Sequence, residues 1–186
     1  EIPTEQLNVR EGKQFLEPFT SMNPFHCVPF LELDDGTVIS ESISICRYLE
    51  EIYPNPALFG TTAETRAIID MWLRRFELDG FLPMLHAVRN HLENFKGRVI
   101  PGTRTDLPQV PQMVTRGIEM GKMFLERVEP HMAENEFVAG SRFSVADITA
   151  FFTIKLTMPL KIDINASYPG VAAWMDRMFK REAFNI

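Results

Sequence analysis

The first third of the chain carries short apolar runs that turn-forming residues separate. Residues 6–9, Gln-Leu-Asn-Val, have the composition of a short strand. Residues 12–22 place apolar side chains on one side at helical spacing, which predicts a short helix. Asn23-Pro24 should end that helix, because a residue before proline avoids the helical region of backbone space.

Two β-rich runs then surround a tight turn. Residues 30–33 and 37–39 flank Asp34-Asp35-Gly36, and aspartate and glycine tolerate the positive φ that a hairpin turn requires. The pattern therefore predicts a β-hairpin. Residues 41–52 follow with apolar positions at i, i+4 and i+7, which predicts a helix that starts near Glu41.

The chain beyond a short proline-containing segment is helical in pattern. An apolar stripe from residue 68 to residue 76 predicts a helix that Asp79-Gly80 and Pro83 should bend or interrupt. Glycine and proline between residues 97 and 111 predict a loop. The patterns further along predict three more helices, at residues 109–133, 146–158 and 169–180.

Composition and charge narrow the possible classes of function. The 186 residues include 19 Lys+Arg and 25 Asp+Glu, and this net charge of −6 argues against a dedicated nucleic-acid binder. A hydrophobic content of 45% excludes disorder as a description of the whole chain, and two cysteines cannot hold together a disulfide scaffold. No apolar run approaches the roughly 20 residues of a membrane-spanning helix, so no membrane partner is expected. Without a signal-peptide pattern, a cytoplasmic protein is expected.

The stretch from Asn23 to Ser42 carries the most specific chemistry. A cis Val28–Pro29 bond would turn the chain sharply and leave the backbone N–H and C=O of Val28 free to pair with an extended peptide. Glu41 and Ser42 stand at a helix start, where free N–H groups suit a ligand carboxylate. The Glu41 side chain can accept a hydrogen bond from an ammonium group beside it. These features predict a receptor for a short peptide with an amino-acid head.

The order of these motifs resembles that of the glutathione transferases, most closely the cytosolic, bacterial members. The motifs that carry the resemblance are Asn-Pro-Phe-x-x-Val-Pro-Phe-Leu from residue 23, Asp-Asp-Gly from residue 34, Glu-Ser-x-x-Ile from residue 41, and the helix-capping pattern Ser144-x-x-Asp147. The resemblance covers essentially the whole chain. It implies an α/β plus all-α architecture with three parts: a thioredoxin-like, glutathione-binding domain at residues 1–53, a linker at 54–61 and an all-helical domain at 62–186.

The resemblance also implies a reaction, a homodimer and residue roles. Glutathione would be the co-substrate, and its thiolate would attack a small hydrophobic electrophile, with no metal involved. Val28 would pair through its backbone with the cysteinyl part, while Glu41 and Ser42 would hold the γ-glutamyl head. Gln14 falls where many members place a side chain near the glycine carboxylate.

The chain departs from the family pattern in two places. Cys27 stands where some members carry Lys or Gln that reaches the glycine carboxylate, and His26 or Lys13 are possible substitutes. In the family, the group that activates the glutathione sulfur lies at the first strand–helix turn, whereas this chain begins near the second strand. A free thiol has a pKa of about 8.5, so the reaction needs a group that favours the thiolate. The catalytic residue is therefore expected in an upstream segment, and it stays unassigned.

Several residues admit simpler roles. Cys27 and His26 are adjacent on an extended segment and should point to opposite faces, which favours an incidental cysteine over a reactive pair. His86 and His91 are five residues apart, which does not match the spacing of a helical metal pair. The apolar residues 76–85 are candidates for the lining of an electrophile pocket between the two domains, and they would equally suit a core.

Functions other than conjugation remain open on such a scaffold. One is a non-catalytic binding or assembly module, and another is a glutathione-dependent isomerase or reductase. The pair Glu41-Ser42 favours a function that binds glutathione, because a purely structural module has no need for the acid.

Overall fold

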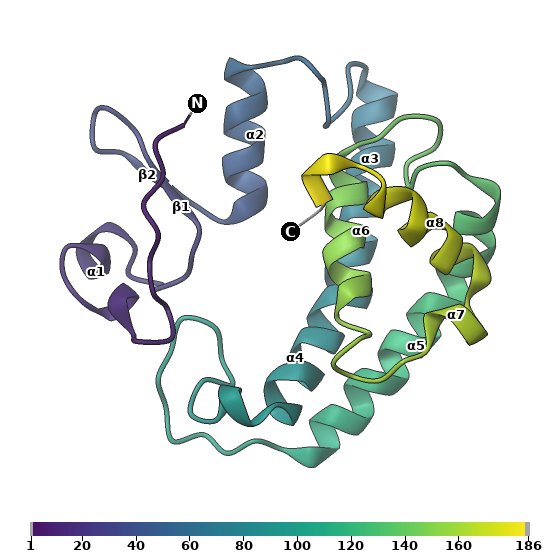
Figure 1. Ribbon diagram of the computed structural model, residues 1–186. Helices are drawn as coiled ribbons and strands as arrows, with labels where there is room; N and C mark the ends of the chain where they lie inside the picture. Colours follow the sequence, from purple (N-terminus) through teal and green to yellow (C-terminus); the bar gives the residue numbers. More distant parts are fainter. Residues whose placement is uncertain (1, 185–186) are drawn as a thin grey trace. The chain divides into compact units, whose positions relative to one another are not determined.

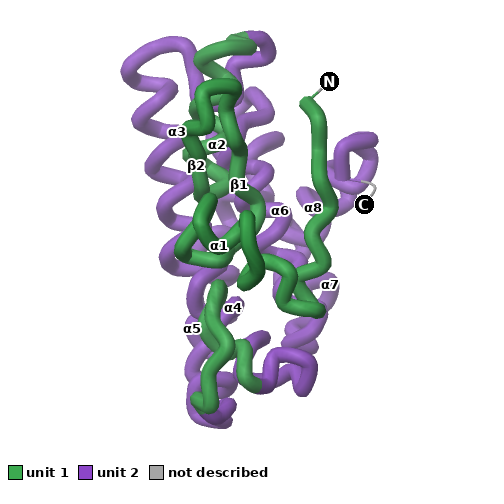
Figure 2. The backbone as a smooth tube through the Cα atoms, turned by 90° about the vertical axis from the view of Figure 1, so that its left-hand side faces the viewer, with its two compact units in different colours: residues 1–54, 97–107 green, residues 55–96, 108–186 purple. Residues whose placement is uncertain are grey.

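The computed structural model describes residues 2–184, and they form two compact units (Figures 1 and 2). The first unit contains the chain up to Pro54 together with Gly97–Leu107. The second contains Asn55–Lys96 and the chain from Pro108 onward. The segment Gly97–Leu107 is thus packed in the first unit, although helices of the second unit precede and follow it in the sequence (Figure 2).

The hairpin of the first unit is confirmed. Strands β1 (Phe30–Glu32) and β2 (Val38–Ser40) pair antiparallel, with Phe30 opposite Ser40. Gly36 has a φ of 83°, and its N–H donates to the Leu33 carbonyl at 2.9 Å, so glycine supplies the positive φ that the turn requires. Helix α2 (Ser42–Ile52) follows where the pattern predicted it.

Two predictions for the first unit are wrong. Residues 6–9 do not form a strand, because no described strand pairs with them and a four-residue β-like run is not stable alone. The single helix predicted at 12–22 is instead a 3₁₀ turn, η1 (Lys13–Phe15), and a short helix, α1 (Phe19–Met22). The break has a local cause, because Pro18 lacks the N–H of a helical bond and the residue before it avoids the helical region.

The second unit opens with a helix that changes its winding midway. Helix α3 (Ala63–Arg75) continues into the π-helical turn η2 (Phe76–Phe81), and then into α4 (Leu82–His91). The predicted bend or interruption at Asp79-Gly80 is therefore a widened turn. A side chain at Gly80 would stand 2.7 Å from Phe124 and 2.8 Å from Thr153, so glycine lets α5 and α6 pack closely there.

The other elements complete a helical unit around a mostly apolar core. Long helix α5 (Pro111–Glu134), helix α6 (Val145–Lys155) and helix α8 (Pro169–Phe179) match predictions to within a few residues. The pattern did not predict helix α7 (Ile164–Ser167) or the 3₁₀ turns η3 (Glu93–Phe95) and η4 (Glu182–Phe184). The largest fully buried side chains include Trp174, Phe76, Phe151 and Leu73. No helix of the described chain is both long and apolar enough to cross a membrane.

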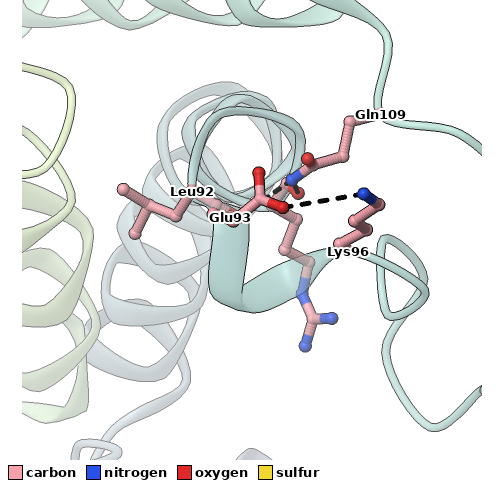
Figure 3. Close-up of polar contacts among 5 residues, drawn as sticks. Leu92, Glu93, Lys96 and Gln109 are labelled. Carbon is pink, nitrogen blue, oxygen red and sulfur yellow. Dashed lines mark hydrogen bonds and ion pairs between the residues drawn. The ribbon is translucent and has the colours of Figure 1, made fainter.

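Helices α4 and α5 pack closely because α5 carries two glycines four residues apart. A side chain at Gly117 would stand 2.5 Å from the Pro83 carbonyl oxygen, and one at Gly121 would stand 2.8 Å from Met84. The end of α4 is capped by Gln109, whose amide donates to the carbonyl oxygens of Arg89 at 2.9 Å and Leu92 at 2.8 Å (Figure 3). Glu93 and Lys96 form an ion pair at 3.7 Å beside this cap. These contacts fix the point where the chain leaves α4.

The predicted capping box at the start of α6 is confirmed. Asp147 accepts hydrogen bonds from the Ser144 N–H at 2.9 Å and from the Ser144 hydroxyl at 3.1 Å. The same carboxylate accepts a third bond, at 2.8 Å, from the N–H of Val138. Because Asp147 is fully buried, this one side chain joins the 138–144 loop to the start of the central helix.

Candidate functional site

The open end of the hairpin brings Val28 and Glu41 to one place. The ladder pairs Phe30 with Ser40, so Val28, two residues before Phe30, and Ser42, two residues after Ser40, lie at the same end. The Val28–Pro29 bond is cis, as predicted, and Val28 is 46% exposed. An extended ligand that pairs with the Val28 backbone would therefore lie beside the start of α2.

The start of α2 is open to a ligand. Glu41 is the N-cap residue, and its side chain makes no capping hydrogen bond to the helix. Its carbonyl oxygen accepts from the Ile45 N–H at 3.0 Å, while Glu41 and Ser42 are both exposed. The amide groups of this first turn have no side-chain cap, so a ligand carboxylate can bind them and use the positive end of the helix dipole.

The backbone of Glu41 is in an unusual conformation. Its φ is 69°, a region that a non-glycine residue with a long side chain rarely adopts. Such conformations persist where the surrounding structure requires them, and they are frequent at ligand sites. The conformation directs the chain from β2 into α2 and leaves the carboxylate in solvent beside the first helical turn.

Gln14 belongs to the same unit but is buried. Only 6% of its surface is exposed, and its side-chain Oε1 has no hydrogen-bond partner among the described residues. An unpaired buried amide oxygen is unfavourable by about 1–3 kcal/mol. This orphaned group is compatible with a polar ligand at this place, although Gln14 is less accessible than the sequence pattern implied.

The segment just before Val28 is fixed by hydrogen bonds. The buried Asn23 donates from Nδ2 to the Cys27 carbonyl oxygen at 2.8 Å and accepts at Oδ1 from the Phe25 N–H at 3.2 Å. His26 has a φ of 53°, and its ring lies 4.7 Å from the ring of Phe15. These contacts hold the loop that presents Val28.

The sequence patterns did not identify the contribution of the Gly97–Leu107 segment to this unit. Arg104 donates from Nη2 to the Val9 carbonyl oxygen at 2.9 Å, and its guanidinium lies 4.9 Å from the centre of the Phe15 ring. These partners are about 90 residues away in the sequence, so no local periodicity could have indicated the contact.

The second unit holds a separate, mostly apolar cavity of about 440 Å³ between α4 and α5. Leu78 and Leu82 line it, and both come from residues 76–85, which the sequence left open as the lining of an electrophile pocket or as core. Met84, from the same segment, is fully buried in the core. Residues 76–85 therefore contribute some side chains to the cavity and others to the core.

Cys46 is a partly buried free cysteine of α2. Burial raises the pKa of the Cys46 thiol, and the nearby charge of Glu50 raises it further. Because the thiolate is the reactive form, this favours a packing role for Cys46. Among the described residues, no group of three or more His, Cys, Asp and Glu side chains is placed to hold a metal ion.

Comparison with known proteins finds relatives in sequence and in structure. The sequence pattern described as "Glutathione S-transferase, N-terminal domain" matches residues 2–52, and "Glutathione S-transferase, C-terminal domain" matches residues 118–182. A solved Gtt2-class glutathione S-transferase of Vibrio parahaemolyticus is 34% identical with a TM-score of 0.82, over 100% of this chain and 84% of that one.

Two relatives compared by sequence are more distant. Glutathione S-transferase 1 of Manduca sexta is 29% identical over 96% of this chain and 76% of its own. Maleylacetoacetate isomerase of Rattus norvegicus is 27% identical over 94% of this chain and 74% of its own.

Proposed function

Because this chain belongs to the glutathione transferase family, we propose that it catalyses the attack of glutathione thiolate on a small hydrophobic electrophile. One observation carries the proposal. The exposed residue Val28 and the uncapped start of α2, with Glu41 beside it, lie at the same end of the hairpin. That combination suits a peptide that has an extended middle and an amino-acid head.

Each part of glutathione has a proposed partner. The cysteinyl amide would pair with the backbone of Val28. The γ-glutamyl carboxylate would bind the amide groups at Ser42, and its ammonium group would pair with Glu41. Gln14 would stand near the glycine end. No residue is assigned to activation of the sulfur.

Further parts of the proposal follow from the family. We propose a cytoplasmic, metal-independent protein with a glutathione-binding domain at residues 1–53, a linker at 54–61 and a helical domain at 62–186. Isomerisation is a second candidate reaction, and the similarity to maleylacetoacetate isomerase favours it. A non-catalytic binding module is a third, and it differs from both enzymes in lacking turnover.

Binding and turnover test the proposal separately. We expect the protein to be retained on immobilised glutathione and eluted by free glutathione. We also expect it to accelerate the conjugation of glutathione with a chromogenic aryl halide. Retention without acceleration would favour the isomerase or the binding module, and a maleyl substrate with catalytic glutathione would distinguish these two. Failure to bind glutathione by calorimetry would refute both enzymatic proposals and would favour a purely structural module.

We also propose a homodimer through the exposed face of α3, α4 and α5. Ile68, Met71, Leu78 and Leu82 are exposed at spacings of three, seven and four residues, and Met113 and Met120 of α5 line the same cavity as Leu78. A contiguous group of exposed apolar side chains is typical of a protein–protein interaction surface.

The mass in solution tests this interface. Light scattering should give twice the mass of one chain, and a double Leu78→Lys, Leu82→Lys variant should be a monomer. Met158→Lys is the matched control, because Met158 is 70% exposed elsewhere in the unit. A wild-type monomer at micromolar concentration would contradict the proposal.

A further inference from the structure

We propose that Arg104, from the segment between α4 and α5, binds the glycine carboxylate of glutathione. The inference rests on the proposed function, because it names a further contact of the same substrate. It assigns to Gly97–Leu107 a direct part in the binding site of the first unit.

The backbone of this segment lies against the residues that precede Val28. Gly102 has a φ of 67°, and a side chain there would collide with the Phe25 carbonyl oxygen and stand 3.0 Å from Cys27 Sγ. Only glycine permits this approach and this φ together. The segment is therefore in direct contact with the loop that presents the Val28 backbone.

Arg104 is held beside the turn that carries Gln14. Its Nη2 bonds to Val9, before Gln14, and its guanidinium stacks on Phe15, directly after Gln14. The Phe15 ring also contacts His26. Arg104 is thus fixed beside the turn around residue 14, and Gly102 of the same segment lies against the loop around residue 26. The family pattern supplies the glycine end of the site from this turn and this loop.

The charge of Arg104 is not neutralised within the described chain. Its side-chain hydrogen bonds go to two carbonyl oxygens, of Val9 and Thr103, and no described carboxylate pairs with it. Partial desolvation lowers the pKa of Arg104, and the charge of Arg98 lowers it further. A guanidinium has five N–H donors, so donors remain for a carboxylate, and the surrounding positive charge favours an anion.

Other polar side chains nearby are less suited to this role. Gln14 is buried and uncharged, and Lys13 is exposed on a flexible stem. Arg104, in contrast, is exposed yet fixed by a hydrogen bond and a ring contact. A pre-positioned cation loses less conformational entropy on binding than a free one.

The test compares glutathione with its glycine monoethyl ester, which has the same peptide but no glycine carboxylate. For the wild type, calorimetry should give a Kd for the ester that is about five- to tenfold higher than the Kd for glutathione. This factor corresponds to a free energy between those typical of an exposed ion pair and of a hydrogen bond to a charged group. Arg104→Met should weaken glutathione binding by that factor and leave ester binding unchanged, so the two Kd values should converge. Arg104→Lys should keep part of the preference.

Two controls make the outcomes distinct. Arg10→Met removes an exposed charge from the turn next to Val9 and should keep the wild-type ratio, and thermal unfolding should show that each variant is folded. Equal weakening of both ligands by Arg104→Met would overturn the proposal, because Arg104 would then act only by holding the loop. An unchanged ratio would overturn it as well. A wild type that binds neither ligand would refute the proposed function itself, whereas a wild type that binds both equally would refute only the role of Arg104.

Discussion

Replacing Asp147 with alanine is expected to lower the free energy of unfolding by about 3–5 kcal/mol. The carboxylate accepts three hydrogen bonds, from Val138 and Ser144, and all three residues are at most 2% exposed. Alanine would leave these donors buried and unpaired and would also open a small cavity. Burial raises the pKa of the Asp147 carboxyl in spite of its hydrogen bonds, which shows how strongly this group is desolvated.

Urea unfolding followed by far-UV circular dichroism measures the loss. Asp176→Ala is the matched control, since Asp176 is exposed on α8 and its replacement should change stability by no more than about 0.5 kcal/mol. Asp147→Asn should fall between the two, because the amide keeps one acceptor oxygen but directs an NH₂ group at a donor. A loss below 1 kcal/mol for Asp147→Ala would mean that the loop and α6 are held together by other contacts.

Local sequence patterns predicted the elements whose causes are local. The hairpin follows from Gly36 at a turn position that requires positive φ, and the capping box follows from two residues three apart. Helix α2 follows from its apolar spacing and from Pro54 beyond its end. In each case the residues that determine the structure lie within one turn or one helix of each other, so a window of the sequence contains the whole cause.

The failures have local and distant causes. The helix at 12–22 was predicted from the spacing of its apolar residues. Pro18 prevents a continuous helix there, because it cannot donate a backbone hydrogen bond. The widened turn at Gly80 depends on Phe124 and Thr153, which belong to other helices. Likewise, the positions of Gly102 and Arg104 depend on residues 9 to 27, and only the folded chain brings them together.

The candidate site also combines residues that a local motif predicts with residues that only the folded chain brings together. Val28, Glu41 and Ser42 belong to one continuous motif, and the hairpin register explains why they meet at one end. The burial of Gln14 was not evident from its position in that motif. The residue proposed for the glycine end therefore had to come from the structure, whereas the residues proposed for the head and middle of the ligand follow from the sequence.

Replacing Glu41 with alanine is expected to weaken glutathione binding by about 1.5–3 kcal/mol, the size of a hydrogen bond to a charged group, or roughly 10- to 150-fold in Kd. Glu41→Gln should lose much of the same energy, because it keeps the shape but removes the charge that attracts the ligand ammonium. Glu51→Ala removes the same charge from the far end of α2, where the side chain is exposed, and should leave the Kd unchanged. Calorimetric titration of the three variants would contradict the assignment if Glu41→Ala and Glu51→Ala behaved alike.

A glycine at this position separates a ligand role from a structural one. Glu41 has a φ of 69° and makes no side-chain cap to α2, so the fold gains little from a glutamate there. Glycine adopts that φ without strain, although it loses the favourable interaction of an acid with the helix dipole and is more flexible when unfolded. These effects oppose one another, so Glu41→Gly should unfold within about 1 kcal/mol of the wild type while binding glutathione as weakly as Glu41→Ala. A large loss of stability with intact binding would instead make Glu41 a structural residue, because the strained backbone would then serve the fold and not the ligand.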